Sequence, residues 1–412
     1  MILLLFAISH AAPQRDVRSF REELGGALGA DISHDSWAWP DDCARLDRLP
    51  TAEEFAELRL SGQPTVISNA WAMFGEQVQQ WRDPDYLRKN YGSLQAHASY
   101  FDTQKAGERF GIQPAEGGKF IIQPYQVTMS LAEVIDFNRT NRLLFIEQYP
   151  IWGLNDDERT LHFDEQGLPE PRSGQHTPLY EEWQRPAFAS SAFHQTEVNL
   201  WLGRMPRGVP PKESPTHYDA TDNLMLQLRG TKTWHLYHAF DAPNLYPQYM
   251  RRRFAQNPDD PAERPTDAPA EWPPDHASQD NFSPVNPTKP DFKKFPRMAN
   301  AHPMTCQTEP GDALFMPAFT WHNVVNEGER TDDPSTDGLS IGVNVWFQGD
   351  LRFKSLFEST MAVLRGGRLT EEEVSSDEDI LAKPRYDLAW RHLVYLWRRQ
   401  CTPREITEIK QR

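Results

Sequence analysis

A histidine and an aspartate stand two residues apart in the segment "SPTHYDATDNLMLQLRGTKTW", residues 214–234. In a β-strand, residues two apart point to the same face, so His217 and Asp219 would present an imidazole and a carboxylate side by side while Tyr218 faces away. These are two ligand types of a facial metal site, in which two histidines and one carboxylate leave coordination positions open. The spacing therefore predicts a metal centre, with a second histidine supplied from elsewhere in the chain.

His322, in "EPGDALFMPAFTWHNVVNEG", is the candidate for that second histidine. It follows a Pro-Gly-Asp turn, a predicted strand and a proline interruption, so a spatially adjacent strand can bring it to the first two ligands. A triad of two histidines and one carboxylate is typical of non-haem Fe(II) oxygenases.

His-x-Asp alone is a weak signal, and His162 with Asp164 forms a second instance. That pair lies among charged and turn-forming residues without an apolar strand, which favours a surface loop. His235 and His238, in "KTWHLYHA", are interpreted as edge or hydrogen-bonded core histidines.

Five apolar runs must position the candidate ligands, and Gly, Pro and Asp punctuate them, as in a β-sandwich or barrel. The runs are "TEVNLWLG", "NLMLQLRG", "KTWHLYHA", "DALFMPA" and "LSIGVNVWF". Upstream, a capping box at Thr51 and Glu54 predicts one short helix, and "WRDPDYLRKNYG" and "SLAEVIDFNRT" predict two more. Further strands are expected in "PTVISNA", "AHASYF", "KFIIQPYQVTM" and "RLLFIEQYP".

The chain of 412 residues divides into an N-terminal segment (1–50), a central domain (51–350) and a helical C-terminal region (351–412). Residues 246–303 are rich in Pro and Asp and are expected to form a surface insertion. The C-terminal region predicts a homodimer, because an apolar stripe at helical spacing can bury itself against its copy, although packing on its own domain is the alternative. The stripe consists of Trp390, Leu393, Val394 and Trp397.

Charge and cysteine content limit the partners and the compartment. A formal net charge of -16 argues against nucleic-acid binding. No stretch approaches the ~20 apolar residues of a membrane span. Cys43, Cys306 and Cys401 do not suggest a disulfide framework, so a cytoplasmic or nuclear location is expected. The start "MILLLFAISHAAPQ" is weakly similar to a signal peptide, which makes the endomembrane lumen or secretion the alternative.

Taken in order, "HYDATDNLMLQLRGTK", "GDALFMPAFTWHNVV" and "GVNVWF" resemble the jumonji-C (cupin-like) family of 2-oxoglutarate-dependent oxygenases. "PTVISNAW" and "VNPTKPDFKKFPRM" look like the protein-hydroxylase branch, which includes the asparaginyl hydroxylase of hypoxia-inducible factor and jumonji-only lysyl hydroxylases. The resemblance implies a mainly β fold: a double-stranded β-helix (a jelly-roll, cupin-like barrel) with N-terminal α/β elements and C-terminal helices.

The same resemblance implies roles for individual residues. His217, Asp219 and His322 would bind Fe(II), and Lys232 would pair with the distal carboxylate of 2-oxoglutarate. Taken alone, Lys232 is an ordinary hairpin lysine. Four more residues match positions near the cosubstrate: Ser214, Asn223, Asn344 and Trp346. For each of these four, plain strand packing or a turn amide is the alternative.

One position departs from the asparaginyl hydroxylase, because Phe145 stands where that enzyme has a tyrosine that binds 2-oxoglutarate. Ser214 and Lys232 then suffice, or Tyr149 or another hydroxyl substitutes, or the affinity for the cosubstrate differs.

The resemblance implies hydroxylation of a protein or peptide side chain, lysyl or asparaginyl, with Fe(II), 2-oxoglutarate and O2. Two alternatives stay open. The same chemistry would demethylate an N-methyl-lysine, and a cupin-like fold can also serve as a non-catalytic binding protein.

Overall fold

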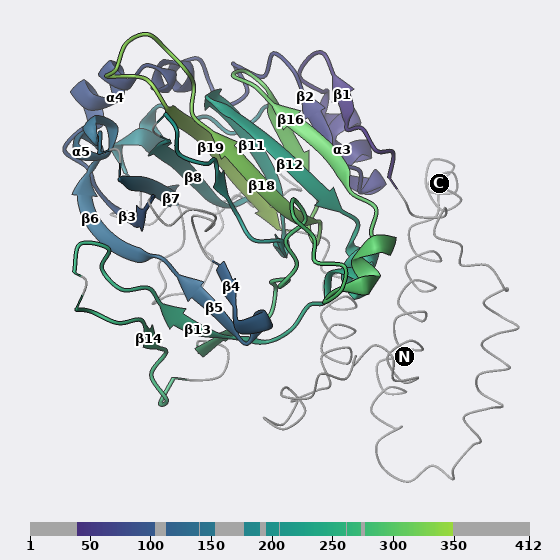
Figure 1. Cartoon of the computed structure of the whole chain (residues 1–412). Coiled ribbons are helices and arrows are strands. Elements are labelled where there is room, and N and C mark those ends of the chain that lie inside the picture. The colour runs from purple at the N-terminus through teal and green to yellow at the C-terminus, as the bar shows by residue number, and fades with distance from the viewer. Residues whose placement is uncertain are drawn as a thin grey trace, which may run out of the picture. The chain divides into compact units, whose positions relative to one another are not determined.

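The computed structural model describes residues 39–103, 113–139, 141–152, 177–189, 195–205, 207–260, 262–272 and 277–348. This part of the chain is mainly β, as predicted, and Figure 1 shows its strands gathered into large sheets with short helices beside them. The predictions for the apolar N-terminal run, for His162 and Asp164, for Cys401 and for the C-terminal helices concern residues outside these ranges.

The larger sheet has nine strands and contains four of the five predicted apolar runs. Its central strands are buried along nearly their whole length because both faces of the sheet are covered. In order across the sheet, the strands are β1 (Ala44–Leu46), β2 (Thr65–Ile67), β17 (Ala313–Met316), β11 (Thr221–Arg229), β19 (Leu339–Gln348), β8 (Gln195–Arg204), β7 (Arg142–Trp152), β3 (Gln95–Asp102) and β6 (Tyr125–Ser130).

A smaller antiparallel sheet contributes the opposite wall of the barrel. It holds β10 (His217–Tyr218), β18 (Trp321–Glu327), β12 (Thr231–Tyr237) and β16 (Met304–Thr308), and β9 (Lys212–Glu213) also pairs with β18. Side chains from both sheets line one cavity, which is the interior of the predicted jelly-roll.

Three short helices cover the outer face of the larger sheet. They are α3 (Ala52–Ser61), α4 (Pro84–Tyr91) and α5 (Leu131–Asp136). Helix α3 begins with the capping box that the sequence predicts, and α5 begins with a second one, formed by Ser130 and Glu133. Their apolar residues Phe55, Leu87 and Ile135 join a core with strand residues such as Leu200 and Val343. The helices leave the inner face of the sheet free to carry the cavity.

The Pro-rich insertion is more ordered than its composition suggests. Strands β13 (Met250–Phe254), β14 (Thr266–Asp267) and β15 (Ser278–Gln279) join β4 (Gln113–Ala115) and β5 (Phe120–Gln123) in a third sheet, whose strands β4, β5, β13 and β14 lie below the other two sheets in Figure 1. Met250, Phe282 and Ile121 form its small core. Phe282 also lines the cavity, so the insertion belongs to the site as well as to the surface.

Cys43 and Cys306 form a disulfide, although the three cysteines did not suggest a disulfide framework in the sequence. The two residues are 263 positions apart, and their Cα atoms lie 5.0 Å apart. The segment before β1 runs beside β16, where the Thr305 amide donates to the carbonyl of Asp41, and this pairing brings the sulfurs together. Sequence spacing holds no trace of such a long-range pairing.

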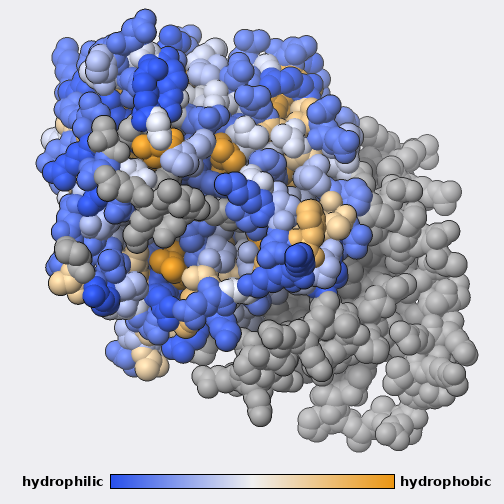
Figure 2. Space-filling model, viewed as in Figure 1, coloured by the Kyte–Doolittle hydropathy of each residue, from blue (hydrophilic) through white to orange (hydrophobic). Residues whose placement is uncertain are grey.

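Among the described helices, none is long and apolar enough to cross a membrane. Figure 2 shows a mainly hydrophilic face with small apolar patches, in keeping with the high charge of the chain.

Candidate active site

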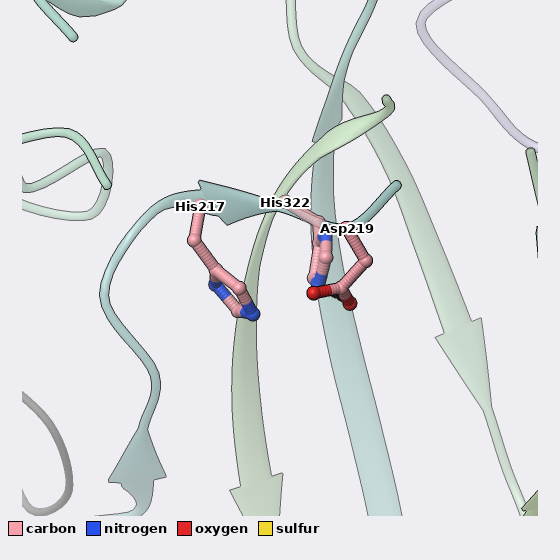
Figure 3. Close-up of side chains that lie close together, drawn as sticks. All are labelled: His217, Asp219 and His322. Carbon is pink, nitrogen blue, oxygen red and sulfur yellow. Dashed lines mark ion pairs between the residues drawn. The ribbon is translucent and has the colours of Figure 1, made fainter. Parts of the chain in front are cut away.

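Strands β10 and β18 bring the predicted metal ligands together. The antiparallel register sets His217 directly opposite His322, and Asp219 follows β10 by one residue. One ligand atom from each of the three side chains lies within 4.8 Å of the others, and Figure 3 shows the side chains grouped with their polar ends near one another. Tyr218 points the other way and packs on Trp321, with 4.8 Å between ring centroids.

Backbone carbonyls orient both imidazoles. Nδ1 of His217 lies 2.8 Å from the carbonyl oxygen of Pro215, and Nδ1 of His322 lies 2.9 Å from that of Thr320. Since a carbonyl only accepts, each Nδ1 carries a proton, and Nε2 is the nitrogen that can ligate a metal. Nε2 of His322 lies 3.7 Å from a carboxylate oxygen of Asp219. A histidine that ligates a metal typically has its second nitrogen held in this way.

The electrostatics of the triad also suit a cation. Burial and the neighbouring His217 lower the pKa of His322 to about 4, against the opposing effect of Asp219. His322 is therefore neutral at physiological pH, as a metal ligand must be. The donor set of two neutral imidazoles and one carboxylate fits a divalent first-row metal ion with open positions.

The triad opens into a cavity of about 300 Å³ between the larger sheet and the smaller antiparallel sheet. Its walls combine apolar rings with polar groups from strands far apart in the sequence. The lining includes Ser99, Gln126, Phe145, Glu147, Gln148, Trp201, Lys212, Ser214, Asn223, Lys232, Trp234, Phe282 and Trp346.

Lys232 lies in this cavity, as the resemblance implies, and it is 4% exposed. Its ammonium lies 5.4 Å from the ring centre of Trp201 and 5.6 Å from that of Trp234. No carboxylate within the described ranges pairs with it, and burial together with the charge of Lys212 lowers the pKa of Lys232 to about 7. An uncompensated buried cation is costly, so the cavity is built to receive an anion.

Ser214, Asn223 and Trp346 also line the cavity. The Ser214 hydroxyl accepts a hydrogen bond from the Val324 amide at 2.9 Å, which leaves its own proton for an acceptor in the cavity. Trp346 has a buried indole N–H without a partner in the described chain.

Asn344 has a different position from the other predicted cosubstrate residues, since it does not line the cavity. Its amide donates to Asn223 at 2.9 Å and its oxygen accepts from the Trp201 indole at 2.8 Å. Asn344 therefore positions two cavity residues from behind.

The remaining histidine predictions agree with the structure. His235 lies 3.0 Å from the side-chain oxygen of Asn323, and the His238 ring accepts from the Phe240 amide. Neither belongs to the cavity lining.

The cavity contains a pair of charged residues that the sequence reasoning missed. Lys212 is buried, lies 4.6 Å from the ring centre of Phe145 and forms an ion pair of 2.6 Å with Glu147. Lys212 stands two residues before Ser214, a spacing that puts both on one face of an extended segment, but β9 ends at Glu213 and is too short to be predicted as a strand. Phe145 faces the cavity, whereas Tyr149 is buried outside it and offers no substitute hydroxyl there.

The residues of the cavity can perform three tasks. The triad can hold a metal ion on one side, Lys232 and Ser214 can bind an anionic group, and the rings of Phe145, Trp201 and Trp346 limit access by water. Such positioning and exclusion of water are what a protein contributes to metal chemistry.

Two facing sheets with this triad between them define a jelly-roll protein equipped to hold a metal ion. Residues 51–352 match the cupin-like domain family, and the chain belongs to that family. The match agrees with the predicted jumonji-C class and spans the predicted central domain.

Several curated proteins are similar to parts of the chain. The HSPB1-associated protein 1 homolog of Danio rerio is 31% identical over 156 residues, which cover 38% of this chain and 26% of that protein. JmjC domain-containing protein E of Dictyostelium discoideum is 23% identical over 321 residues, covering 74% and 84%. The tRNA wybutosine-synthesizing protein 5 of Gallus gallus is 29% identical over 147 residues, covering 36% and 33%. The chain thus spans about a quarter of the length of the HSPB1-associated relatives it matches.

Proposed function

We propose that this chain is an Fe(II)- and 2-oxoglutarate-dependent oxygenase that hydroxylates a side chain of a protein or peptide. One observation carries the proposal: a triad of two histidines and an aspartate shares a cavity with Lys232, a buried cation that has no carboxylate partner in the described chain. A metal site and an anion site in one cavity match the two ends of a keto acid that also carries a distal carboxylate.

The proposal assigns each group a task. His217, Asp219 and His322 would hold Fe(II), which with bound 2-oxoglutarate supplies the oxidative decarboxylation that activates O2 for insertion into a C–H bond. Lys232 and Ser214 would bind the distal carboxylate and so orient the cosubstrate. The surrounding rings would keep water from the reacting groups.

The substrate class is part of the proposal. A net charge of -16 disfavours a polyanionic substrate, and the name of the HSPB1-associated relatives indicates a protein partner for those proteins. We therefore propose a lysyl or asparaginyl side chain of a protein.

The test supplies the purified full chain with Fe(II), 2-oxoglutarate, O2 and a peptide library, and follows both succinate and peptide mass. Succinate release with gain of one oxygen atom by a peptide supports the proposal. Loss of a CH2 unit from a methylated lysine would identify a demethylase instead. Absence of succinate with the peptide library, and with RNA supplied in its place, would favour a non-catalytic binding protein.

A further inference from the structure

The smaller sheet sets two lysines on either side of one asparagine. In β9, β18 and β12, the register places Lys212 opposite Asn326 and Lys232 opposite the same Asn326 from the other side. Residues in register across neighbouring strands share a face, so the three side chains form one row. All three line the cavity and are buried. Both lysines therefore line the same part of the cavity, close enough for the charge of Lys212 to lower the pKa of Lys232.

The two lysines differ in their partners. Lys232 pairs with no carboxylate of the described chain, whereas Lys212 pairs with Glu147 at 2.6 Å. Glu147 is the one hydrogen-bonding or ion-pairing partner of Lys212 among the described residues. An ammonium carries three N–H donors, so the pair with Glu147 leaves donors without an acceptor in a buried position. Buried donors of this kind indicate a ligand acceptor.

Phe145 supplies the reason for a second lysine. The ring of Phe145 forms the cavity wall where a hydroxyl is expected from the resemblance, and a phenyl ring has no donor for a carboxylate. The Lys212 ammonium lies over this ring, 4.6 Å from its centre. It therefore brings N–H donors to the place where Phe145 offers none.

Charge balance is compatible with this position. Glu147 neutralises Lys212, so the pair adds donors without adding net charge. A divalent metal ion with Asp219 and Lys232 leaves two positive charges, which match a dicarboxylate. Lys212 can contact the ligand without upsetting this balance.

We infer that Lys212 is a second cation for the distal carboxylate of 2-oxoglutarate and replaces the donor that Phe145 lacks, while Glu147 positions the ammonium. This inference rests on the proposed function, because it names a further ligand-binding residue of the same site. The alternative is that Lys212 and Glu147 form only a structural pair in the wall.

Calorimetric titration of the full chain, loaded with Mn(II) so that turnover does not consume the ligand, separates these cases. The probes are 2-oxoglutarate and 2-oxopentanoate, which has the same chain without the distal carboxylate. We expect Lys212→Met to weaken 2-oxoglutarate binding about 10- to 100-fold, the range of a charge-assisted hydrogen bond, and to change 2-oxopentanoate binding by less than about twofold. Lys212→Gln, which keeps a neutral donor, should show a smaller loss in the same pattern and serves if Lys212→Met does not fold.

Glu147→Gln is the matched control, because it removes the charge of the partner but keeps the lysine and a side-chain oxygen that can accept from its ammonium. We expect it to weaken 2-oxoglutarate binding by no more than about threefold. An equal loss in Glu147→Gln and Lys212→Met would overturn the inference in favour of a structural pair. Equal losses for the two ligands in the Lys212 variants would overturn it as well.

Lys232→Met separates this inference from the proposed function. If Lys232→Met abolishes 2-oxoglutarate binding and Lys212→Met leaves it intact, the inference fails and the proposed function stands. If the wild-type protein binds no 2-oxoglutarate, the proposed function fails and the inference with it.

Discussion

At the scale of single residues, the site depends on the protonation and orientation of three side chains. Each histidine donates through Nδ1 to a backbone carbonyl just before its strand, that of Pro215 before β10 and that of Thr320 before β18. The backbone therefore fixes the direction in which each Nε2 points. Asp219 completes the set from the residue after β10. Removing one ligand leaves a site that cannot hold the metal in the same geometry.

We therefore expect His217→Ala and Asp219→Ala to lower the affinity for Fe(II) at least about tenfold and to abolish 2-oxoglutarate turnover. Metal titration and succinate release measure the two effects. His235→Ala is the control, since that ring contacts Asn323 outside the cavity. Full turnover by Asp219→Ala would show that the metal centre lies elsewhere.

Lys232 is expected to lower the stability of the ligand-free protein and to strengthen the binding of 2-oxoglutarate. Its buried ammonium lacks a carboxylate partner in the described chain, so Lys232→Met should stabilise the ligand-free protein by ~1 kcal/mol or more while it removes most affinity for 2-oxoglutarate. Thermal unfolding without metal or cosubstrate measures the first effect. Lys212→Met should destabilise instead, because it removes the cation that pairs with the Glu147 carboxylate. Equal destabilisation by both variants would mean that Lys232 has an anionic partner in the protein.

The pKa of Lys232, lowered to about 7 mainly by burial, predicts how pH affects binding. Below pH 7 the lysine is already charged, so affinity for 2-oxoglutarate should change little from this cause. Above pH 7 the free protein must take up a proton on binding, and affinity should fall by up to about tenfold per pH unit. Titrations of the wild type and of Lys232→Met, which keeps the other charged groups of the cavity (Lys212, Glu147, Asp219 and the histidines), isolate the effect. A wild-type profile no steeper than that of the variant would contradict this prediction.

Among single residues, the sequence predicted those whose side-chain type and spacing match a known metal or cosubstrate site. The triad, Lys232 and Ser214 lie in one cavity as expected. Lys212 was not predicted, because lysines near turns are common and usually exposed. Only the structure shows that Lys212 is buried and pairs with Glu147. Asn344 was expected near the cosubstrate, yet it lies outside the cavity lining and forms hydrogen bonds with Asn223 and Trp201. Hydrogen bonds between side chains of different strands cannot be predicted from residue spacing along the chain.

At the scale of elements, strand β7 bends where it enters the cavity. Its pairing with β8 shifts register between Ile146 and Tyr149, and Gln148 takes a left-handed conformation with φ of 58°. Successive strand residues normally face opposite sides, but this irregularity lets both Glu147 and Gln148 line the cavity. The bulge thus creates part of the wall that holds Lys212.

The backbone at Gln148 predicts an asymmetric response to substitution. Gln148→Ile should destabilise the protein by ~1 to 2 kcal/mol, because a β-branched residue tolerates positive φ poorly, whereas Gln148→Gly should be nearly neutral. Urea unfolding measures both. Gln95→Ile, the same change at an exposed position of β3, is the control. Equal stability of Gln148→Ile and Gln148→Gly would contradict the left-handed assignment.

Strands with long apolar runs were predictable, and most strands of two or three residues, β2 excepted, were not. All five runs from β8 onward form strands. Strands β11, β17 and β19 are buried on both faces, whereas β12 alternates between buried and half-buried residues. Strand β10 has two residues and β9 has two, which is too short for any periodicity. The ligand-bearing strand was therefore inferred from its chemistry rather than from its pattern.

At the scale of the whole molecule, the disulfide between Cys43 and Cys306 joins the start of the described chain to the edge strand β16. The strand next to β16 is β12, which carries Lys232. Disulfides persist in oxidising compartments, so we propose the endomembrane lumen or secretion, the alternative location, for this chain. Composition alone cannot predict such a bond, because it gives the number of cysteines and not the distance between them in the folded chain.

Cys43→Ser should lower the free energy of unfolding by ~2 to 4 kcal/mol, since the bond closes a loop of 263 residues in the unfolded chain. Urea unfolding with and without a reducing agent measures this loss. The wild type under reducing conditions should behave like Cys43→Ser, and Cys401→Ser should behave like the wild type. Equal stability of the oxidised wild type and Cys43→Ser would exclude a structural bond.

The central claim, that the triad and Lys232 form one site for Fe(II) and 2-oxoglutarate, has a direct test. Under anaerobic conditions, 2-oxoglutarate is titrated into the Fe(II)-loaded full chain, and the visible charge-transfer absorption of a keto acid chelated to Fe(II) is recorded. We predict a saturable band in the wild type, a band that needs far more 2-oxoglutarate in Lys232→Met, and none in His217→Ala. A wild-type protein that holds Fe(II) but develops no band, or a band that is unchanged in both variants, would contradict the claim.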